Sequence, residues 1–175
     1  MKGLTLGLAA LLVGMLTAAV PTTTQAQVAI GPYAGYNLDA EELYFGTNVR
    51  FTIPAAIGNS FLVANPRFDY YPFIGSDVEG LDVSASYYAF NLDVFYPFVL
   101  SSESLTPYVG AGFLISRASV EVLGISQSDT DVGLNLKGGA MFGSGRVQPF
   151  GEGVLAIAGN TGLMLKGGVY ITLGR

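Results

Sequence analysis

Residues 162–173, GLMLKGGVYITL, decide the fold class of this chain. One parity of the stretch carries only apolar residues and glycine, with Leu163, Leu165, Val169, Ile171 and Leu173 as its side chains. The other parity mixes polar and apolar side chains, which include Met164, Lys166, Tyr170 and Thr172. Because successive side chains of a β-strand point to opposite faces, this alternation predicts a strand with one apolar face and one mixed face.

The same two-residue alternation recurs in seven further runs that are separated by turn-forming residues. Together with the final run, the predicted strands cover residues 28–37, 43–53, 61–71, 83–96, 107–116, 131–142, 147–158 and 162–173. Most exceed the usual strand length of about five or six residues and suit a tilted strand of about 9–11 residues that crosses a bilayer. The sequence therefore predicts an all-β domain.

The composition favours a surface that meets something other than water. Charged residues make up 12% of the chain, about half of the roughly 25% usual for soluble domains, and hydrophobic residues make up 50%. No apolar run after residue 27 approaches the ~20 residues of a spanning helix. Any crossing of a membrane must therefore use strands.

The residue types that are missing limit the chemistry. The chain contains no histidine and no cysteine, so it lacks the commonest general base and metal ligand and has no thiolate. A Ser/His or Asp/His pair for hydrolysis cannot be built without histidine. We therefore expect no enzymatic activity and no cofactor, although a hydrolase that uses carboxylates alone stays open. The net charge of −5 argues against a nucleic-acid partner.

Residues 1–26 are typical of a cleaved signal peptide. They begin with a positive charge at Lys2, continue with an apolar stretch over residues 4–20 and end on small residues suited to cleavage at residues 24–26. Residues 27–175 would then form a single exported domain. A retained membrane anchor is the alternative.

Eight alternating strands fit two closed architectures. A soluble barrel of the lipocalin kind puts its apolar residues inside, whereas a membrane barrel puts them outside. The mixed faces of all eight strands carry few charges: Arg50, Arg67, Asp69, Asp93, Lys137, Glu152 and Lys166. So few charges would leave a water-facing wall insoluble but suit a narrow lumen. We predict an eight-stranded antiparallel up-and-down transmembrane β-barrel; a soluble periplasmic lipid-binding barrel is the alternative.

The predicted lumen charges are the best functional candidates. Lys137, Glu152 and Lys166 stand on three consecutive strands and form one set, and the remaining charges on the second to fourth strands form another. Paired charges would plug a lumen that is barely wider than its own side chains. A narrow passage for small solutes, or a small-ligand site, is the alternative.

Aromatic residues and acidic residues mark the strand ends. We predict that aromatics near the bilayer interfaces form a girdle, although core packing would also explain them: Tyr36, Tyr70, Tyr88, Tyr96, Phe142 and Phe150. The outward connections are predicted at residues 38–42, 72–82, 117–130 and 159–161, too short for a receptor-like surface. With Arg117 as their one cation, these connections and the neighbouring strand end carry Asp39, Glu41, Glu42, Asp77, Glu79, Asp82, Glu121, Asp129 and Asp131.

An acidic rim at these connections would mainly serve solvation. Asp39, Glu41 and Glu42 offer hard oxygen ligands for a divalent cation, but their spacing matches no calcium loop. They are a weak metal candidate.

Four segments carry a resemblance to a known family: YAFNLDVFYPF (88–98), TPYVGAGF (106–113), GLNLKGG (133–139) and VQPFGEG (147–153). They resemble hairpin signatures of the small eight-stranded outer-membrane barrels of Gram-negative bacteria, the porin-like outer membrane protein beta-barrel domain group with its OmpA/OmpX/OmpW-type relatives. The resemblance covers residues 27–175. Members usually end in an aromatic residue, whereas this chain ends in Arg175.

The resemblance implies a protein of the cell outer membrane with lipid and the barrel assembly machinery as partners. We expect a monomer with a structural, membrane-integrity role and a plugged lumen. Members of the group also include small-solute passages and surface-interaction proteins, and a fold does not choose among such roles.

Overall fold

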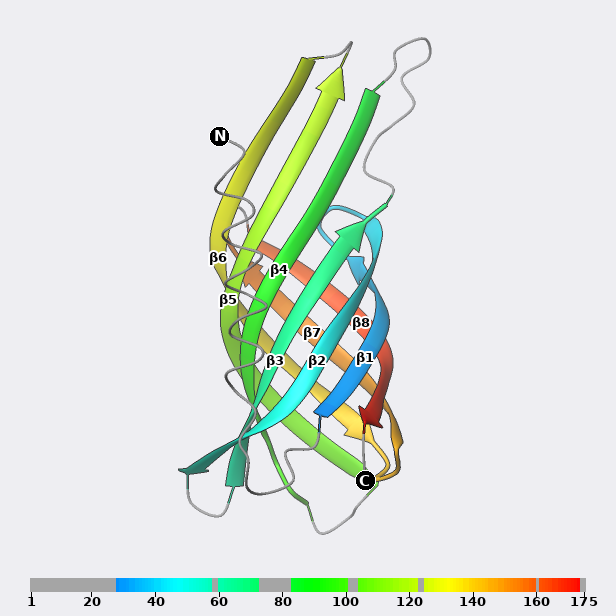
Figure 1. Cartoon of the computed structure of the whole chain (residues 1–175), viewed down its shortest axis with the longest axis vertical. Coiled ribbons are helices and arrows are strands. Elements are labelled where there is room, and N and C mark those ends of the chain that lie inside the picture. The colour runs from blue at the N-terminus through cyan, green and yellow to red at the C-terminus, as the bar shows by residue number, and fades with distance from the viewer. Residues whose placement is uncertain are drawn as a thin grey trace.

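The alternating segments form eight antiparallel strands that close into a barrel, as predicted (Figure 1). The computed structural model describes residues 28–57, 60–72, 83–100, 104–122, 125–159 and 161–173, so the predicted signal peptide lies outside the described residues. The strands are β1 (Val28–Asn37), β2 (Glu42–Ile57), β3 (Ser60–Tyr71), β4 (Val83–Pro97), β5 (Leu105–Val122), β6 (Ile125–Phe142), β7 (Val147–Ile157) and β8 (Thr161–Leu173).

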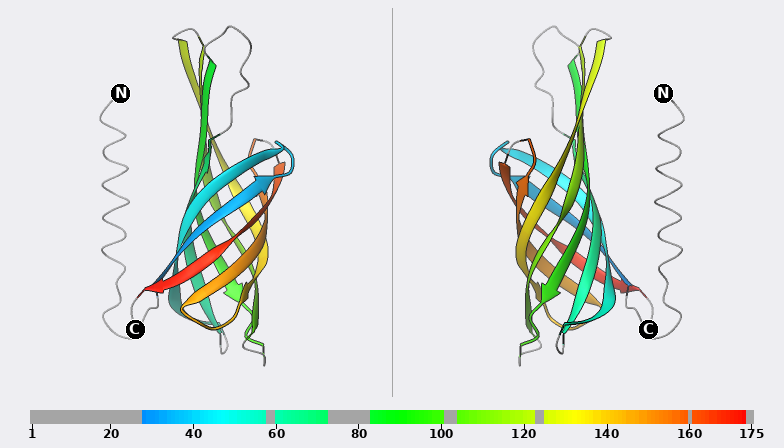
Figure 2. Two further views of the ribbon diagram at one scale, coloured as in Figure 1. Left: turned by 90° about the vertical axis from the view of Figure 1, so that its right-hand side faces the viewer. Right: turned by 90° about the vertical axis from the view of Figure 1, so that its left-hand side faces the viewer.

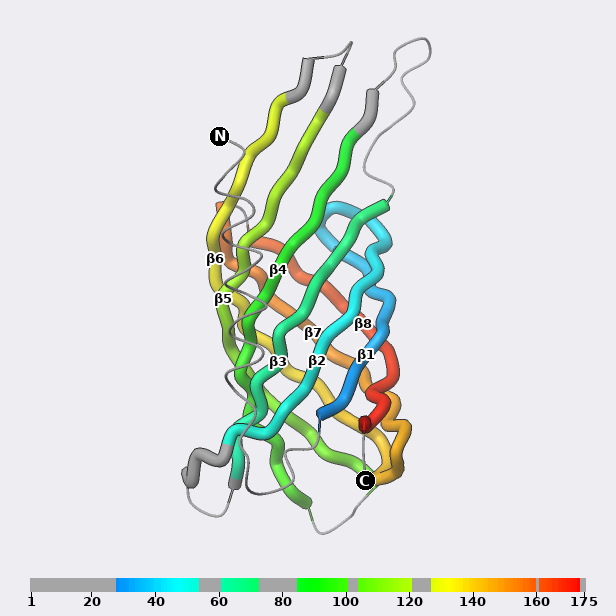
Figure 3. Tube along the Cα trace, in the orientation of Figure 1, coloured from blue at the N-terminus to red at the C-terminus, as the bar shows by residue number. Residues whose placement is uncertain are grey.

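Each strand pairs with its neighbour in the chain, and β8 closes the barrel on β1 through pairs such as Val28 with Leu173. These two residues lie at the same end as the connections β2–β3, β4–β5 and β6–β7, which we call the inner mouth (Figure 3). The opposite end, where β1 joins β2 and β7 joins β8, is the outer mouth. No helix among the described residues is long and apolar enough to cross a membrane.

The apolar parity faces outward all around the barrel. In β8, Leu163 and Leu165 are 43% and 51% exposed, whereas Lys166 and Tyr170, further along the strand, are 6% and 0% exposed. The other strands repeat this arrangement, with large exposed side chains such as Phe113 and Leu136 outside. Charges inside and leucines outside are the reverse of a soluble barrel.

Inward glycines make room for inward tyrosines on the neighbouring strand. Tyr33 of β1 lies opposite Gly46 of β2, and Tyr44 of β2 lies opposite Gly35 of β1. A Cβ atom at either glycine would overlap the ring of the facing tyrosine. The small residues of the mixed face therefore let bulky rings fold across the lumen of a narrow barrel.

The barrel wall is taller on one side, which corrects one prediction. β5 and β6 have 18 residues each, and they run through most of residues 117–130, where an outward loop was predicted. Beyond the pairs Tyr71–Tyr87 and Leu134–Ile157, β4, β5 and β6 continue as a three-stranded sheet that projects past the outer mouth (Figure 2). The expectation of short outward connections with little surface was wrong on this side.

Candidate functional site

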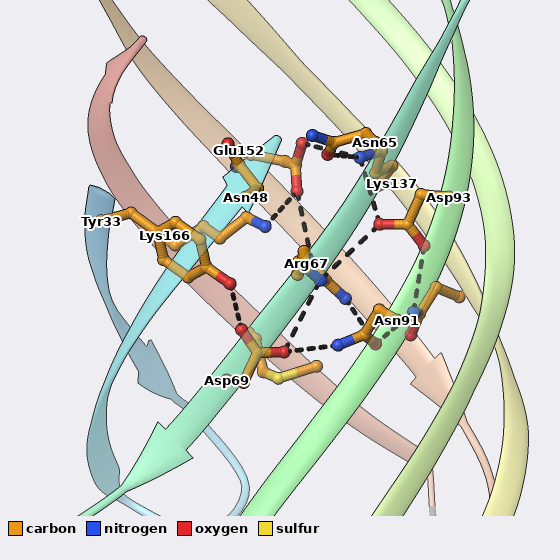
Figure 4. A network of polar contacts seen from close by, with 12 residues as sticks. Tyr33, Asn48, Asn65, Arg67, Asp69, Asn91, Asp93, Lys137, Glu152 and Lys166 are labelled. Carbon is orange, nitrogen blue, oxygen red and sulfur yellow. Dashed lines mark hydrogen bonds and ion pairs between the residues drawn. The ribbon is translucent and has the colours of Figure 1, made fainter. Parts of the chain in front are cut away.

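The middle of the lumen holds six charged side chains that come from five strands (Figure 4). They share the inward parity of their strands and are each at most 6% exposed. The cations and the carboxylates are equal in number, namely Arg67, Lys137 and Lys166 with Asp69, Asp93 and Glu152. We call these six residues the charge network.

Arg67 of β3 stands at the centre of the charge network. Its Nε atom lies 3.6 Å from Asp69 Oδ2 and 3.7 Å from Asp93 Oδ2. Its Nη1 atom lies 3.6 Å from Glu152 Oε1, across the lumen on β7. Its Nη2 atom donates a hydrogen bond of 2.9 Å to Asn91 Oδ1. One guanidinium thus joins three strands, because its planar fork offers donors in several directions.

Glu152 is the counterion of the cations on the far wall. Its Oε1 atom lies 2.8 Å from Lys166 Nζ, and its Oε2 atom lies 3.5 Å from Lys137 Nζ. The hydroxyl of Tyr108 donates a hydrogen bond of 2.8 Å to the same Oε2 atom. Lys137 also lies 3.2 Å from Asp93 Oδ2, which links this half of the network to the Arg67 half.

Buried asparagines complete the network. Asn91 donates to Asp69 Oδ2 at 2.8 Å, Asn135 donates to Asn91 Oδ1 at 2.7 Å, and Asn65 accepts from Lys137 Nζ at 2.8 Å. The sequence interpretation did not single out these three amides. The signal was present, since each lies two residues before a charged member of the network: Asn65 before Arg67, Asn91 before Asp93, and Asn135 before Lys137.

Aromatic layers lie on both sides of the charge network. Towards the outer mouth, Tyr44 stacks on Tyr71 with ring centroids 4.9 Å apart. The hydroxyl of Tyr33 donates a hydrogen bond to Asp69 Oδ1. Towards the inner mouth, Phe95 packs on Tyr108 at 4.7 Å. The lumen is therefore occupied in three layers, with tyrosines above the charges and aromatic rings below them.

Arg50 lies apart from the charge network, which corrects the predicted second set. Its Nη2 atom donates to Gln148 Oε1 at 2.7 Å, and its guanidinium lies 4.4 Å from the centre of the Tyr170 ring, near the inner mouth. Within the described part of the chain it has no carboxylate within 4.0 Å. The predicted sets therefore merge into one network that leaves Arg50 out.

The predicted position of Phe150 is also wrong. It was predicted in an outward girdle, but it is 4% exposed and stacks on Tyr170 inside the barrel at 4.4 Å. Phe150 lies two residues before Glu152, so the two must share the inward face. The other predicted girdle residues point outward, with Tyr96 packed on Phe98 and the rest exposed, namely Tyr36, Tyr70, Tyr88 and Phe142.

The acidic rim is only partly described. Asp39 Oδ2 accepts a hydrogen bond of 2.5 Å from the backbone N–H of Leu163, which fastens the β1–β2 turn to β8. Asp77, Glu79 and Asp82, with the side chain of Glu121, lie outside the described residues. The described part contains no group of three or more acidic residues that could hold a metal ion, and Glu41 and Glu42 are not gathered with Asp39 into one.

The fold is similar to that of solved outer-membrane barrels. The N-terminal barrel domain of OprF from Pseudomonas aeruginosa matches with a TM-score of 0.61 and 15% identity, over 86% of this chain and 100% of that chain. Ail, the attachment invasion locus protein of Yersinia pestis, matches with a TM-score of 0.59 and 15% identity over the same shares. Neisserial surface protein A matches with a TM-score of 0.56 and 16% identity, over 85% and 96%.

At such low sequence identity, these similarities show the fold alone. No match was found among curated protein sequences. The family model described as outer membrane protein beta-barrel domain matches residues 6–144. The predicted membrane barrel is thereby confirmed in preference to a soluble one, and the chain belongs to the outer membrane protein beta-barrel domain family, whose place is the outer membrane.

Proposed function

We propose that the protein has a structural role in the integrity of the outer membrane and that its lumen is plugged rather than conducting. The observation that carries this proposal is the charge network, in which three buried cations meet three buried carboxylates at mid-lumen. The charge network is neutral as a whole and offers no free charge to a passing ion.

The energetics support a closed lumen. An eight-stranded barrel is just wide enough for its own side chains, and here aromatic layers lie above and below the charges. To let a solute pass, Arg67 would have to leave Asp69, Asp93 and Glu152 at once. Separating buried charges from their partners is costly because each then lacks both water and a counterion.

The rest of the proposal concerns partners. The outward apolar side chains would contact lipid, and the barrel assembly machinery would insert the chain. We propose a monomer that binds no nucleic acid and no cofactor, and that has no enzymatic activity, since histidine and cysteine are absent from the sequence.

Planar-bilayer recording tests the plugged lumen. The purified barrel should give no steady conductance at either polarity, while a general porin reconstituted in the same membrane should. Liposome-swelling assays with small neutral and charged solutes should likewise match empty vesicles. A stable open channel, or swelling above that of empty vesicles, would replace the plug by a narrow solute passage.

A further inference from the structure

The inner mouth contains a cavity of about 220 Å³ that the charge network does not use. Its polar lining comes from Arg50, Thr52, Thr106 and Gln148. Apolar side chains, including those of Phe61 and Val63, form much of the remaining wall. These residues belong to the ends of their strands that lie with Val28 and Leu173 (Figure 3). A barrel exported with its termini in the periplasm would open this cavity to the periplasm.

Arg50 differs from the other inward cations. Arg67, Lys137 and Lys166 each lie within 4.0 Å of a carboxylate, whereas Arg50 has no such partner within the described ranges. Its donors instead reach Gln148 Oε1 at 2.7 Å and Met141 Sδ at 2.6 Å, and both are neutral. A guanidinium has five N–H donors, so these contacts leave some of them for a ligand.

A partly buried cation without a counterion favours an anion beside it. The cost of removing its charge from water is offset when a carboxylate accepts two parallel hydrogen bonds from the guanidinium fork. The hydroxyls of Thr52 and Thr106 add further donors in the same cavity. The wall at Phe61 and Val63 favours an apolar body on the ligand, since binding pockets combine apolar walls with a few polar groups.

We propose that this cavity binds a small organic carboxylate from the periplasmic side. Its carboxylate pairs with Arg50, and its apolar body lies against Phe61 and Val63. The site is separate from the charge network, so the proposal holds whether or not the lumen conducts.

Calorimetric titration with benzoate tests the site in a detergent with an uncharged headgroup. The wild-type barrel should give a saturable binding heat, and benzamide, which has the same shape without the charge, should bind about tenfold or more weakly. Arg50→Met should lose benzoate binding by a similar factor. Arg146→Gln is the matched control, because Arg146 is an exposed cation at the same mouth whose Nε atom donates to Thr172 O. Equal losses in both variants would overturn the site.

A measurement on the wild type avoids dependence on variant folding. In NMR spectra, benzoate should shift the methyl signals of Thr52 and Thr106 and the side-chain amide of Gln148, with one common saturation curve. Inorganic phosphate, an anion without an apolar body, should bind more weakly than benzoate. Absence of saturable shifts with benzoate, or stronger binding of phosphate, would overturn the proposal.

A variant of Glu103 provides the last part of the test. Glu103 belongs to the β4–β5 connection and lies outside the described residues. Glu103→Gln should bind benzoate with the wild-type affinity. If the wild type is silent and Glu103→Gln binds benzoate, then Glu103 itself is the anion that Arg50 takes, and the proposed external ligand is wrong.

Discussion

Leu165 and Lys166 are neighbours in β8, yet they lie on opposite faces of the barrel wall. Leu165 is 51% exposed on the outer wall, whereas Lys166 is 6% exposed and lies 2.8 Å from Glu152 inside it. The outer face needs only apolar surface, so many residues fit each position. The inner face needs particular partners at particular distances, so a single change there disturbs several side chains.

The largest expected effect comes from Glu152→Ala, which removes the counterion shared by Lys166, Lys137 and Arg67. Lys137 and Arg67 keep Asp93, but Lys166 loses its carboxylate partner. Leaving a buried cation unpaired typically costs about 3–5 kcal/mol of unfolding free energy. The loss should appear in urea unfolding of the lipid-reconstituted barrel and as a lower temperature in gel heat-modifiability assays. Leu165→Ala, on the outer face, is the matched control and should cost far less in lipid.

A double variant separates charge balance from simple loss of packing. Glu152→Gln combined with Lys166→Gln removes one carboxylate and one cation, so it should recover part of the stability that Glu152→Gln alone loses. If the losses of unfolding free energy in the two single variants add up to that of the double variant, the Glu152–Lys166 pair contributes little to stability. That result would argue against a network that acts as a unit.

The next largest effect is expected when a charged residue is introduced on the outer face. Leu136 is exposed on the outer wall, near the middle of the part of β6 that pairs with β7. Leu136→Arg should cost about 2–4 kcal/mol if it lies near the bilayer midplane. Val132 also points outward, but it lies on β6 beyond the last pair with β7. Val132→Arg should therefore cost at most about 1 kcal/mol, and equal costs would contradict the depth implied by the barrel.

A smaller effect is expected from a single methyl group on the inner face. Gly35→Ala would push a Cβ atom into the ring of Tyr44, and such overpacking costs about 1–3 kcal/mol. Gly151 has the outward parity of β7, between Phe150 and Glu152, and a Cβ atom there would meet nothing within 4 Å. Gly151→Ala should therefore change the unfolding free energy by at most about 0.5 kcal/mol. Similar losses of unfolding free energy in both variants would contradict the argument that a facing aromatic ring requires glycine at the inward position.

Alternation was enough to predict the barrel because the strands keep their parity over most of the described residues, with a register shift near the end of β2. The same parity places Lys137, Glu152 and Lys166 inside. It also places Asn91 inside, but the prediction of lumen residues considered charged residues alone. Phe150 was assigned to the girdle by residue type and position along the strand, although its parity put it inside. These errors were avoidable from the sequence.

Two other features depend on information that a strand pattern lacks. The isolation of Arg50 follows from the register of β2 against its neighbours and from the reach of each side chain, neither of which the alternation specifies. The projecting sheet was missed because polar residues such as Ser119 and Ser128 resemble a loop in composition. They pair with each other across β5 and β6, where both sheet faces can meet water.

The smallest expected effect concerns a carboxylate at the rim rather than in the lumen. Asp39→Ala removes an exposed hydrogen bond to the backbone of Leu163 and should cost about 0.5–1.5 kcal/mol. Asp39→Asn keeps an acceptor oxygen and should retain most of that stability. Adding calcium or a chelator should leave the melting temperature of the wild type unchanged. A calcium-dependent rise that Asp39→Asn abolishes would instead make the rim a cation site, and the value of this carboxylate would then lie in its charge.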